Sequence, residues 1–242
     1  MERRNGIMNK FLSACDFTGH DRSSTHWYPS DSKALFETNI KSRNRQALKK
    51  LNYTDTSIIY EFNSAGFRDK EFKQNGIAFF GCSFGFGIGV NATDRYTNIL
   101  ENRLKIRCNN LCVPASGSDT VRRILPYWID KLRPKIVLHH FMFPVRREII
   151  HNDSINLWLP GMLMARHKVR KLIDEKFVDQ KTKENLQSIK NHCVSNNITY
   201  IEYKNVYNDR GARDLIHPGP KSHIEMANEI HKLILKHLKG DY

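Results

Sequence analysis

Residues 77–90 read IAFFGCSFGFGIGV, and this stretch decides the fold that we predict for the chain. Its first part, residues 77–81, is a continuous apolar run that ends in glycine, which is typical of a parallel strand buried on both faces. The small residues that follow allow a sharp turn from the strand into a helix. The whole stretch contains four glycines and is shorter than the roughly 20 residues of a membrane span. We therefore expect a buried strand here and no transmembrane helix.

Strand and helix patterns alternate from this stretch to the C-terminus. An alternation of this kind predicts a parallel sheet with helices on both faces. We predict an α/β fold, a three-layer α/β/α domain of flavodoxin-like type over residues 57–242, with an N-terminal extension, residues 1–56, packed on the core. The expected strands are residues 57–62, 77–81, 110–113, 135–141 and 198–202, and the expected helices are residues 96–106, 121–132, 166–196 with one break, and 222–238.

The composition limits the class of protein and its partners. With 40% hydrophobic residues the 242-residue chain can bury a core, which excludes a wholly disordered protein. Thirty-nine Lys and Arg against 25 Asp and Glu give a net charge of +14, which favours an anionic partner. The five cysteines include no C-x-x-C pair, so neither a disulfide framework nor a zinc ribbon is predicted.

Ser83 follows the first strand of the alternating region. In parallel α/β sheets the ligand site lies beyond the carboxyl ends of the strands. A serine on a tight strand-to-helix turn is exposed there beside backbone N–H groups, which can meet the charge that develops when a nucleophile attacks a carbonyl. The alternatives are a glycine-rich turn with a buried serine and a phosphate-binding loop. The glycine signatures of nucleotide-binding loops are absent, which disfavours the phosphate-binding loop.

Asp214 and His217 lie three residues apart, just before the last predicted helix. On a turn, this spacing lets a carboxylate orient an imidazole whose other nitrogen faces a nucleophile. Taken alone, such a pair is more often a helix cap or a surface pair. Together with Ser83, it predicts a Ser-His-Asp triad.

Several motifs resemble those of the SGNH (GDSL) hydrolases. Residues 81–84, GCSF, are similar to the Gly-Asp-Ser-Leu/Phe block of that family, residues 214–218, DLIHP, to its last block, and residues 110–117, NLCVPASG, to its second block. Residues 63–69, NSAGFRD, and 117–123, GSDTVRR, are similar to segments of such proteins from marine phages and bacteria. The resemblance covers residues 57–238.

The resemblance implies ester hydrolysis through a covalent acyl-enzyme, with Ser83 as nucleophile, His217 as base and Asp214 as its orienting group. The N–H groups of Ser83 and of Ala115 or Gly117 are the expected oxyanion donors. No metal or organic cofactor is implied. Expected substrates are acylated small molecules, glycans or lipids, and the net charge favours an anionic carrier of the acyl group. The N-terminal region holds no apolar segment of secretory length, so we expect no signal peptide and a cytoplasmic or virion-associated protein.

Three positions depart from the family pattern. Cys82 stands where the family usually has Asp, and Ala115 stands at the expected glycine of the second block. The asparagine of the third block, an oxyanion donor, falls near Pro144, which has no N–H. Loss of one such donor costs about 3 kcal/mol of transition-state stabilisation, so we expect low activity. Arg146 and Arg147 could compensate or bind an acidic substrate, and the alternative is that both are surface charges.

Other interpretations stay open. The departures favour a second hypothesis, an inactive binding or virion-associated structural protein with the same fold. Nucleic acid as a partner of the basic run at residues 41–50 is disfavoured, because no aromatic residues interleave with its charges. An α/β-hydrolase site at residues 81–85 is disfavoured by the tight spacing of Asp214 and His217. Cys82 is a weaker candidate nucleophile than Ser83.

Two further features carry weaker predictions. His139 and His140 alternate on one strand, so we expect one to pack in the sheet and the other to approach the site, and we expect no metal there. Residues 155–164 are an apolar insertion that could form a lid, an oligomer contact or buried packing.

Overall fold

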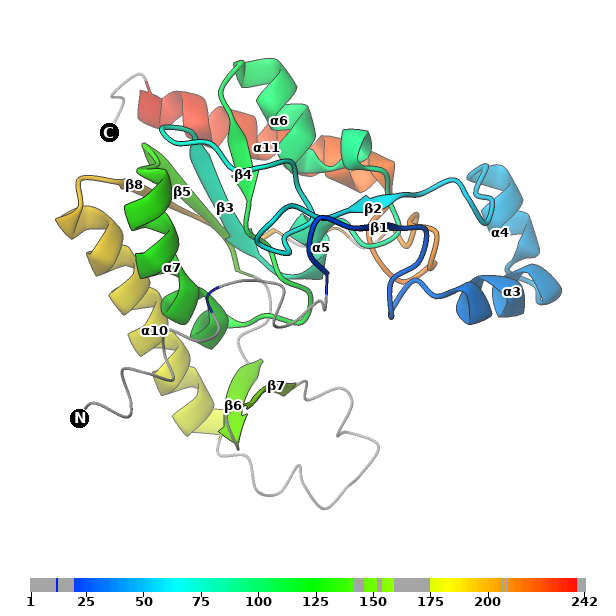
Figure 1. Ribbon diagram of the computed structural model, residues 1–242, viewed down its shortest axis with the longest axis horizontal. Coiled ribbons are helices and arrows are strands. Elements are labelled where there is room, and N and C mark those ends of the chain that lie inside the picture. The colour runs from blue at the N-terminus through cyan, green and yellow to red at the C-terminus, as the bar shows by residue number, and fades with distance from the viewer. Residues whose placement is uncertain are drawn as a thin grey trace.

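The computed structural model of the chain describes residues 12, 20–141, 146–151, 154–158, 175–205, 207 and 209–238. At its centre is a four-stranded parallel sheet with the order β4-β3-β5-β8 (Figure 1). The predicted parallel α/β sheet is thus confirmed. Its strands are β3 (Ile77–Gly81), β4 (Cys108–Asn110), β5 (Ile136–His140) and β8 (Thr199–Tyr203).

Helices cover both faces of this sheet (Figure 1). On one face lie α6 (Tyr96–Leu104) and α11 (Pro220–Leu238), and on the other lie α7 (Ser118–Leu132) and α10 (Glu175–Ser195). These are the three layers expected from the sequence. None of the helices in the described part of the chain is both long and apolar enough to cross a membrane.

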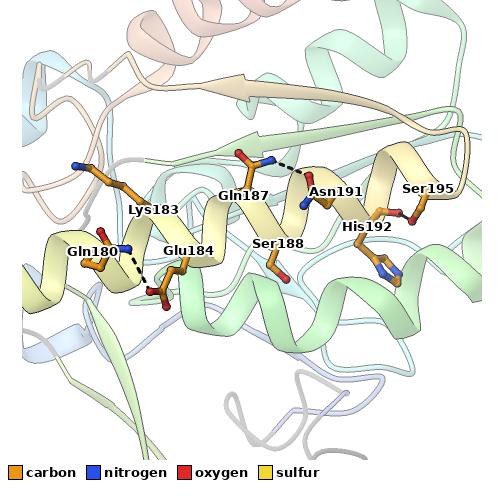
Figure 2. A pocket seen from close by; sticks show the side chains of 8 residues that line it. All are labelled: Gln180, Lys183, Glu184, Gln187, Ser188, Asn191, His192 and Ser195. Carbon is orange, nitrogen blue, oxygen red and sulfur yellow. Dashed lines mark hydrogen bonds between the residues drawn. The ribbon is translucent and has the colours of Figure 1, made fainter.

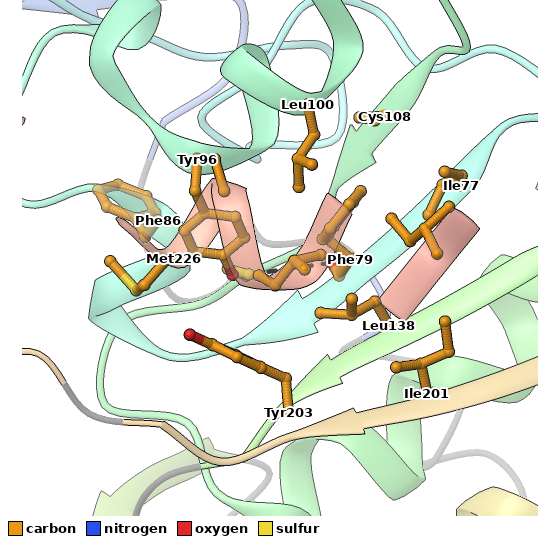
Figure 3. Packing of buried hydrophobic residues seen from close by; sticks show 14 of the residues in the cluster. Ile77, Phe79, Phe86, Tyr96, Leu100, Cys108, Leu138, Ile201, Tyr203 and Met226 are labelled. Atoms are coloured by element: carbon orange, nitrogen blue, oxygen red, sulfur yellow. Dashed lines mark hydrogen bonds between the residues drawn. The ribbon is translucent and has the colours of Figure 1, made fainter. Parts of the chain in front are cut away.

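The alternation of side chains along β3 explains why its sequence is apolar throughout. Ile77 and Phe79 belong to the core cluster between the sheet and α6 and α11, where Figure 3 shows Phe79 among side chains of the neighbouring elements. Ala78 and Phe80 belong to the cluster on the other face, with residues of α7. Because successive side chains of a strand point to opposite faces, a strand covered on both sides needs an apolar residue at every position.

The N-terminal segment joins the fold through a short antiparallel pair, β1 (Ser24–Thr25) with β2 (Tyr60–Glu61). Two helices, α3 (Lys33–Lys41) and α4 (Arg45–Lys50), follow β1, and the second of them lies in the basic run noted in the sequence. Figure 1 shows both helices beyond the β1–β2 pair. The pairing crosses residue 56, and the division into an extension and a core domain at that residue stays a prediction.

Some elements differ from the sequence-based expectation. β4 begins two residues before the predicted strand, although the N–H groups of Leu111 and Val113 still donate to the carbonyls of Phe79 and Gly81, at 2.8 and 2.9 Å. The apolar insertion contributes to an antiparallel hairpin of β6 (Arg147–His151) and β7 (Ser154–Trp158). Residues 166–174 of the predicted long helix lie outside the described residues.

Candidate functional site

Ser83 begins the one-turn helix α5 (Ser83–Phe86), directly after β3 and Cys82. The helix ends at Gly87, whose φ of 80° is the left-handed conformation that favours glycine. A Cβ on Gly85 would lie 2.3 Å from the sulfur of Cys112, so only glycine fits there. The sharp strand-to-helix turn expected from the sequence is therefore present.

Arg68 holds the backbone that follows Ser83 in place. Its guanidinium is almost fully buried and donates to the carbonyls of Phe86, Gly87 and Val90. It also lies over the ring of Tyr60, 4.0 Å from the centroid. Burial lowers the pKa of Arg68 to about 9, and it remains charged at neutral pH. The segment at residues 63–69 thus supports the serine turn, a role that its sequence alone did not reveal.

Asp69, the neighbour of Arg68, anchors the start of the second block. One of its oxygens accepts the backbone N–H of Asn110 at 2.9 Å and a guanidinium N–H of Arg107 at 2.8 Å. Arg95 adds an ion pair at 3.8 Å. Burial raises the pKa of Asp69, and the two arginines oppose that rise. Residues 63–69 therefore hold both the turn at Ser83 and the start of the second block, residues 110–117.

The Asp214–His217 pair forms as the spacing predicted. Nδ1 of His217 lies 2.5 Å from Oδ2 of Asp214. The other oxygen, Oδ1, accepts the backbone N–H groups of Ile216 and His217, both at 3.0 Å. Asp214 is 2% exposed, while 14% of the His217 side chain is accessible. A carboxylate fixed in this way directs the Nδ1 proton toward itself and leaves Nε2 as the proton acceptor.

The loop that carries this pair packs against the serine turn. The His217 ring lies edge-on to the ring of Phe84, the residue after Ser83, with 5.8 Å between centroids. The backbone N–H of Arg213 donates to the carbonyl of Gly89 at 2.8 Å. A Cβ on Gly89 would meet the backbone nitrogen of Arg213 at 2.9 Å, so the contact is close. The structure brings the two segments together across more than a hundred residues of sequence.

The second block passes close to the same edge of the sheet. Ala115 has a φ of 66°, in the left-handed region, and Ser116 Oγ donates to the carbonyl of Gly81 at 2.8 Å. Gly117 precedes α7, and a Cβ there would lie 2.5 Å from the carbonyl oxygen of Arg146. Residues at the ends of β3 and β5, at the end of the second block and in the first turn of α7 line a small cavity at this edge, namely Gly81, Cys82, Ser116, Gly117, Val121, His139, His140 and Phe141.

The two arginines proposed for substrate binding have different surroundings. The backbone of Arg146 lies against Gly117. Arg147 donates to the hydroxyl of Ser118 at 3.3 Å and to that of Thr182 at 2.7 Å, so it joins β6 to α7 and α10. Pro144, at the expected third-block position, lies outside the described residues.

The segment at residues 117–123 anchors the β6–β7 hairpin. Arg123 makes a two-point contact with the carboxylate of Glu148, at 2.9 and 2.8 Å. Asp119 accepts the backbone N–H of Glu148 at 3.3 Å. The sequence signal for a hairpin is the pair Asn152 and Asp153, two typical turn residues between residues 147–151 and 154–158.

Both histidines of β5 are packed inside the sheet layers. His139 Nδ1 lies 3.1 Å from the hydroxyl of Tyr200, and the ring of His140 contacts the hydroxyl of Tyr96 and the carbonyl of Asn205, at 3.3 and 3.2 Å. Burial lowers their pKa values to about 3 and about 4, so both are neutral. We expected only one of them to pack in this way. No three His, Cys, Asp or Glu side chains of the described residues are grouped to hold a metal.

A separate surface depression lies along α10 (Figure 2). All of its lining residues come from that single helix, and all are polar. Figure 2 shows hydrogen bonds between Gln180 and Glu184 and between Gln187 and Asn191, which are ordinary contacts one helical turn apart. The depression along α10 includes none of the residues that the motifs single out.

Comparisons with known proteins give structural similarity only. A scan against protein-family models finds no match, and neither does a search of the curated proteins. Among solved structures, the chain is similar to a lipolytic protein of the G-D-S-L family from Desulfitobacterium hafniense DCB-2, with 13% identity over 64% of this chain and 71% of that one and a TM-score of 0.38.

Two esterases are similar to this chain with comparable identities and TM-scores. The psychrotrophic esterase EstA from Pseudoalteromonas sp. is 15% identical over 69% of this chain and 100% of its own, with a TM-score of 0.41. A family two carbohydrate esterase from Clostridium thermocellum is 15% identical over 70% of this chain and 66% of its own, with a TM-score of 0.40.

Proposed function

We propose that this chain is a serine ester hydrolase of the SGNH (GDSL) type, with Ser83, His217 and Asp214 as its triad. The observation that carries the proposal is the 2.5 Å contact between His217 and Asp214, on a loop that packs against the turn that begins with Ser83. This is the pairing of an oriented base with a serine at the carboxyl end of a parallel strand that acyl transfer requires.

The reaction follows from these roles. Nε2 of His217 takes the proton of the Ser83 hydroxyl while the serine oxygen bonds to the ester carbonyl carbon. The imidazolium, stabilised by Asp214, returns that proton to the departing alcohol as the ester bond breaks, which leaves an acyl-serine. Water then attacks the acyl-serine and gives a proton to His217, which passes it to the Ser83 oxygen as the acyl–serine bond breaks, so that the acid and free Ser83 are released.

Ser83 and Ala115 are the proposed oxyanion donors. The N–H of Ser83 lies at the start of α5, among the N–H groups that a helix leaves without internal partners. The left-handed backbone of Ala115 is a conformation that normally selects glycine, which supports its equivalence to the glycine of the family's second block. Gly117, with a φ of −125°, is the weaker candidate.

The proposed substrate is an acylated carbohydrate or lipid with an acidic group near the ester. The excess of positive charge supports this, and the backbone of Arg146 lies against Gly117, beside the second block. Arg146 and Arg147 are the proposed contacts for such a group. A weakly active or inactive binding protein is the second candidate function, favoured by Pro144 at the position of the third-block asparagine.

Active-site labelling tests the proposal. The parent protein, Ser83→Ala and Cys82→Ala are incubated with a fluorophosphonate probe and, separately, with p-nitrophenyl acetate. We expect labelling and turnover in the parent and in Cys82→Ala, and neither in Ser83→Ala. Labelling that persists in Ser83→Ala excludes this serine as the nucleophile, and a parent without labelling or turnover supports the inactive alternative.

A further inference from the structure

The side chain of Arg213, the residue before Asp214, is held by residues of the N-terminal segment. Its side chain is fully buried. Its Nε and Nη2 donate to the carboxylate of Asp31, the latter at 2.8 Å, and Nη1 donates to the carbonyl of Asp55 at 3.1 Å. The guanidinium also lies over the ring of Trp27, 4.1 Å from its centroid. The backbone beside Asp214 is therefore held by residues more than 150 positions earlier in the chain.

Asp31 is also linked to the segment that follows Ser83. The hydroxyl of Tyr60 donates to Oδ2 of Asp31 at 2.6 Å and accepts the backbone N–H of Gly89 at 2.8 Å. The carbonyl of Gly89, in turn, accepts the backbone N–H of Arg213 at 2.8 Å. Gly89, Tyr60, Asp31 and Arg213 thus form a closed ring of hydrogen bonds, which we name the Asp31 ring.

The Asp31 ring connects the two parts of the proposed triad. One of its members, Gly89, lies on the segment that follows α5, where the N–H groups of Gly87 and Ile88 donate to the carbonyl of Ser83, at 3.0 and 3.2 Å. Another member, Arg213, directly precedes Asp214 in the chain. All four of its members are buried, so water does not compete for these bonds.

We propose that Asp31 is a positioning residue for catalysis, which fixes the Asp214–His217 loop relative to Ser83 through Arg213 and Tyr60. The inference rests on the proposed function. It assigns the N-terminal segment a part in the site. An error of about 1 Å in the placement of a reacting group can reduce the rate about 100-fold, so a loosened loop lowers kcat more than it changes KM.

Two substitutions in the Asp31 ring test this. Asp31→Asn keeps the shape but removes the charge that faces Arg213, and Tyr60→Phe removes only the hydroxyl that joins Gly89 to Asp31. Glu101→Gln is the matched control. It changes a carboxylate to an amide in the ion pair with Arg107, at the start of β4 and hence at the opposite end of the sheet.

Two readouts separate positioning from a general loss of stability. The first is kcat and KM for p-nitrophenyl acetate, where we expect kcat to fall about 10- to 100-fold in Asp31→Asn and less in Tyr60→Phe, with KM little changed. The second is the downfield proton NMR signal of His217 Nδ1–H, assigned by its loss in His217→Ala. We expect that signal to shift or broaden in both variants and to stay in place in Glu101→Gln.

The NMR signal also distinguishes the two ways in which the inference can fail. A parent without esterase activity contradicts the proposed function, while the signal still reports whether the Asp31 ring holds the loop. If the parent is active and folded Tyr60→Phe keeps the parental kcat and signal, the positioning role is refuted. Tyr60→Phe decides the question alone if Asp31→Asn does not fold.

Discussion

Asp214→Asn is the substitution whose effect the structure defines most sharply. It exchanges one carboxylate oxygen for an NH2 group of similar size. Oδ1 of Asp214 accepts two backbone N–H groups, those of Ile216 and His217, at 3.0 Å each. An NH2 group cannot occupy that place, because donors would face donors. The amide oxygen must therefore take the position of Oδ1, and the NH2 group must face Nδ1 of His217.

This orientation forces the wrong tautomer on His217. Nδ1 can then only accept a hydrogen bond, so the ring proton moves to Nε2, the atom that takes the proton of Ser83 in the proposed triad. A tautomer error of this kind in a serine triad lowers kcat about 10⁴-fold, which corresponds to about 5 kcal/mol of activation free energy. Stability should change little, because both backbone N–H groups keep an acceptor.

Asp214→Ala provides the contrast. It removes the acceptor of the two backbone N–H groups, so it should lower the free energy of unfolding by about 1–3 kcal/mol. The assays are steady-state hydrolysis of p-nitrophenyl acetate and urea unfolding of the parent and both variants. An Asp214→Asn protein that keeps kcat within tenfold of the parent refutes the role of His217 as the base.

Two further predictions concern stability. Burial lowers the pKa to about 3 in His139 and His223 and to about 4 in His140. At mildly acidic pH, the unfolded chain therefore binds protons that the folded chain does not. The free energy of unfolding should fall as the pH drops from about 6.5 toward 4, by about 2 kcal/mol per histidine at pH 5. Urea titrations at pH 7.5 and 5 measure how much unfolding free energy is lost between the two pH values. This loss should be about 2 kcal/mol smaller in His223→Gln than in the parent, and an equal loss in the two proteins contradicts the prediction. Ala115→Gly should leave stability unchanged or raise it by up to about 1 kcal/mol, because relief of a left-handed alanine outweighs the added entropy of the unfolded chain. The control Ala47→Gly, in α4, should lower the free energy of unfolding by about 1 kcal/mol in the same assay. If Ala115→Gly loses as much stability as Ala47→Gly, the backbone of Ala115 is not strained.

The sequence predicted those features whose causes are local. The strand Ile77–Gly81 has the predicted bounds, because every position of a strand buried on both faces is apolar. The contact between Asp214 and His217 follows from their spacing on a turn. The Asp31 ring could not be predicted, since its ion pair joins residues 182 positions apart and an isolated Asp or Arg reads as a surface charge.

The buried arginines also bear on the anionic substrate. Arg68, Arg95 and Arg213 are among the largest fully buried side chains, so they cannot attract a ligand from solution. Two of them, however, pair with buried carboxylates, Arg213 with Asp31 and Arg95 with Asp69. The three buried arginines and the two buried aspartates together account for only one unit of the net charge of +14. The excess positive charge therefore resides in the rest of the chain, where it can raise the local concentration of the anionic substrate that we propose.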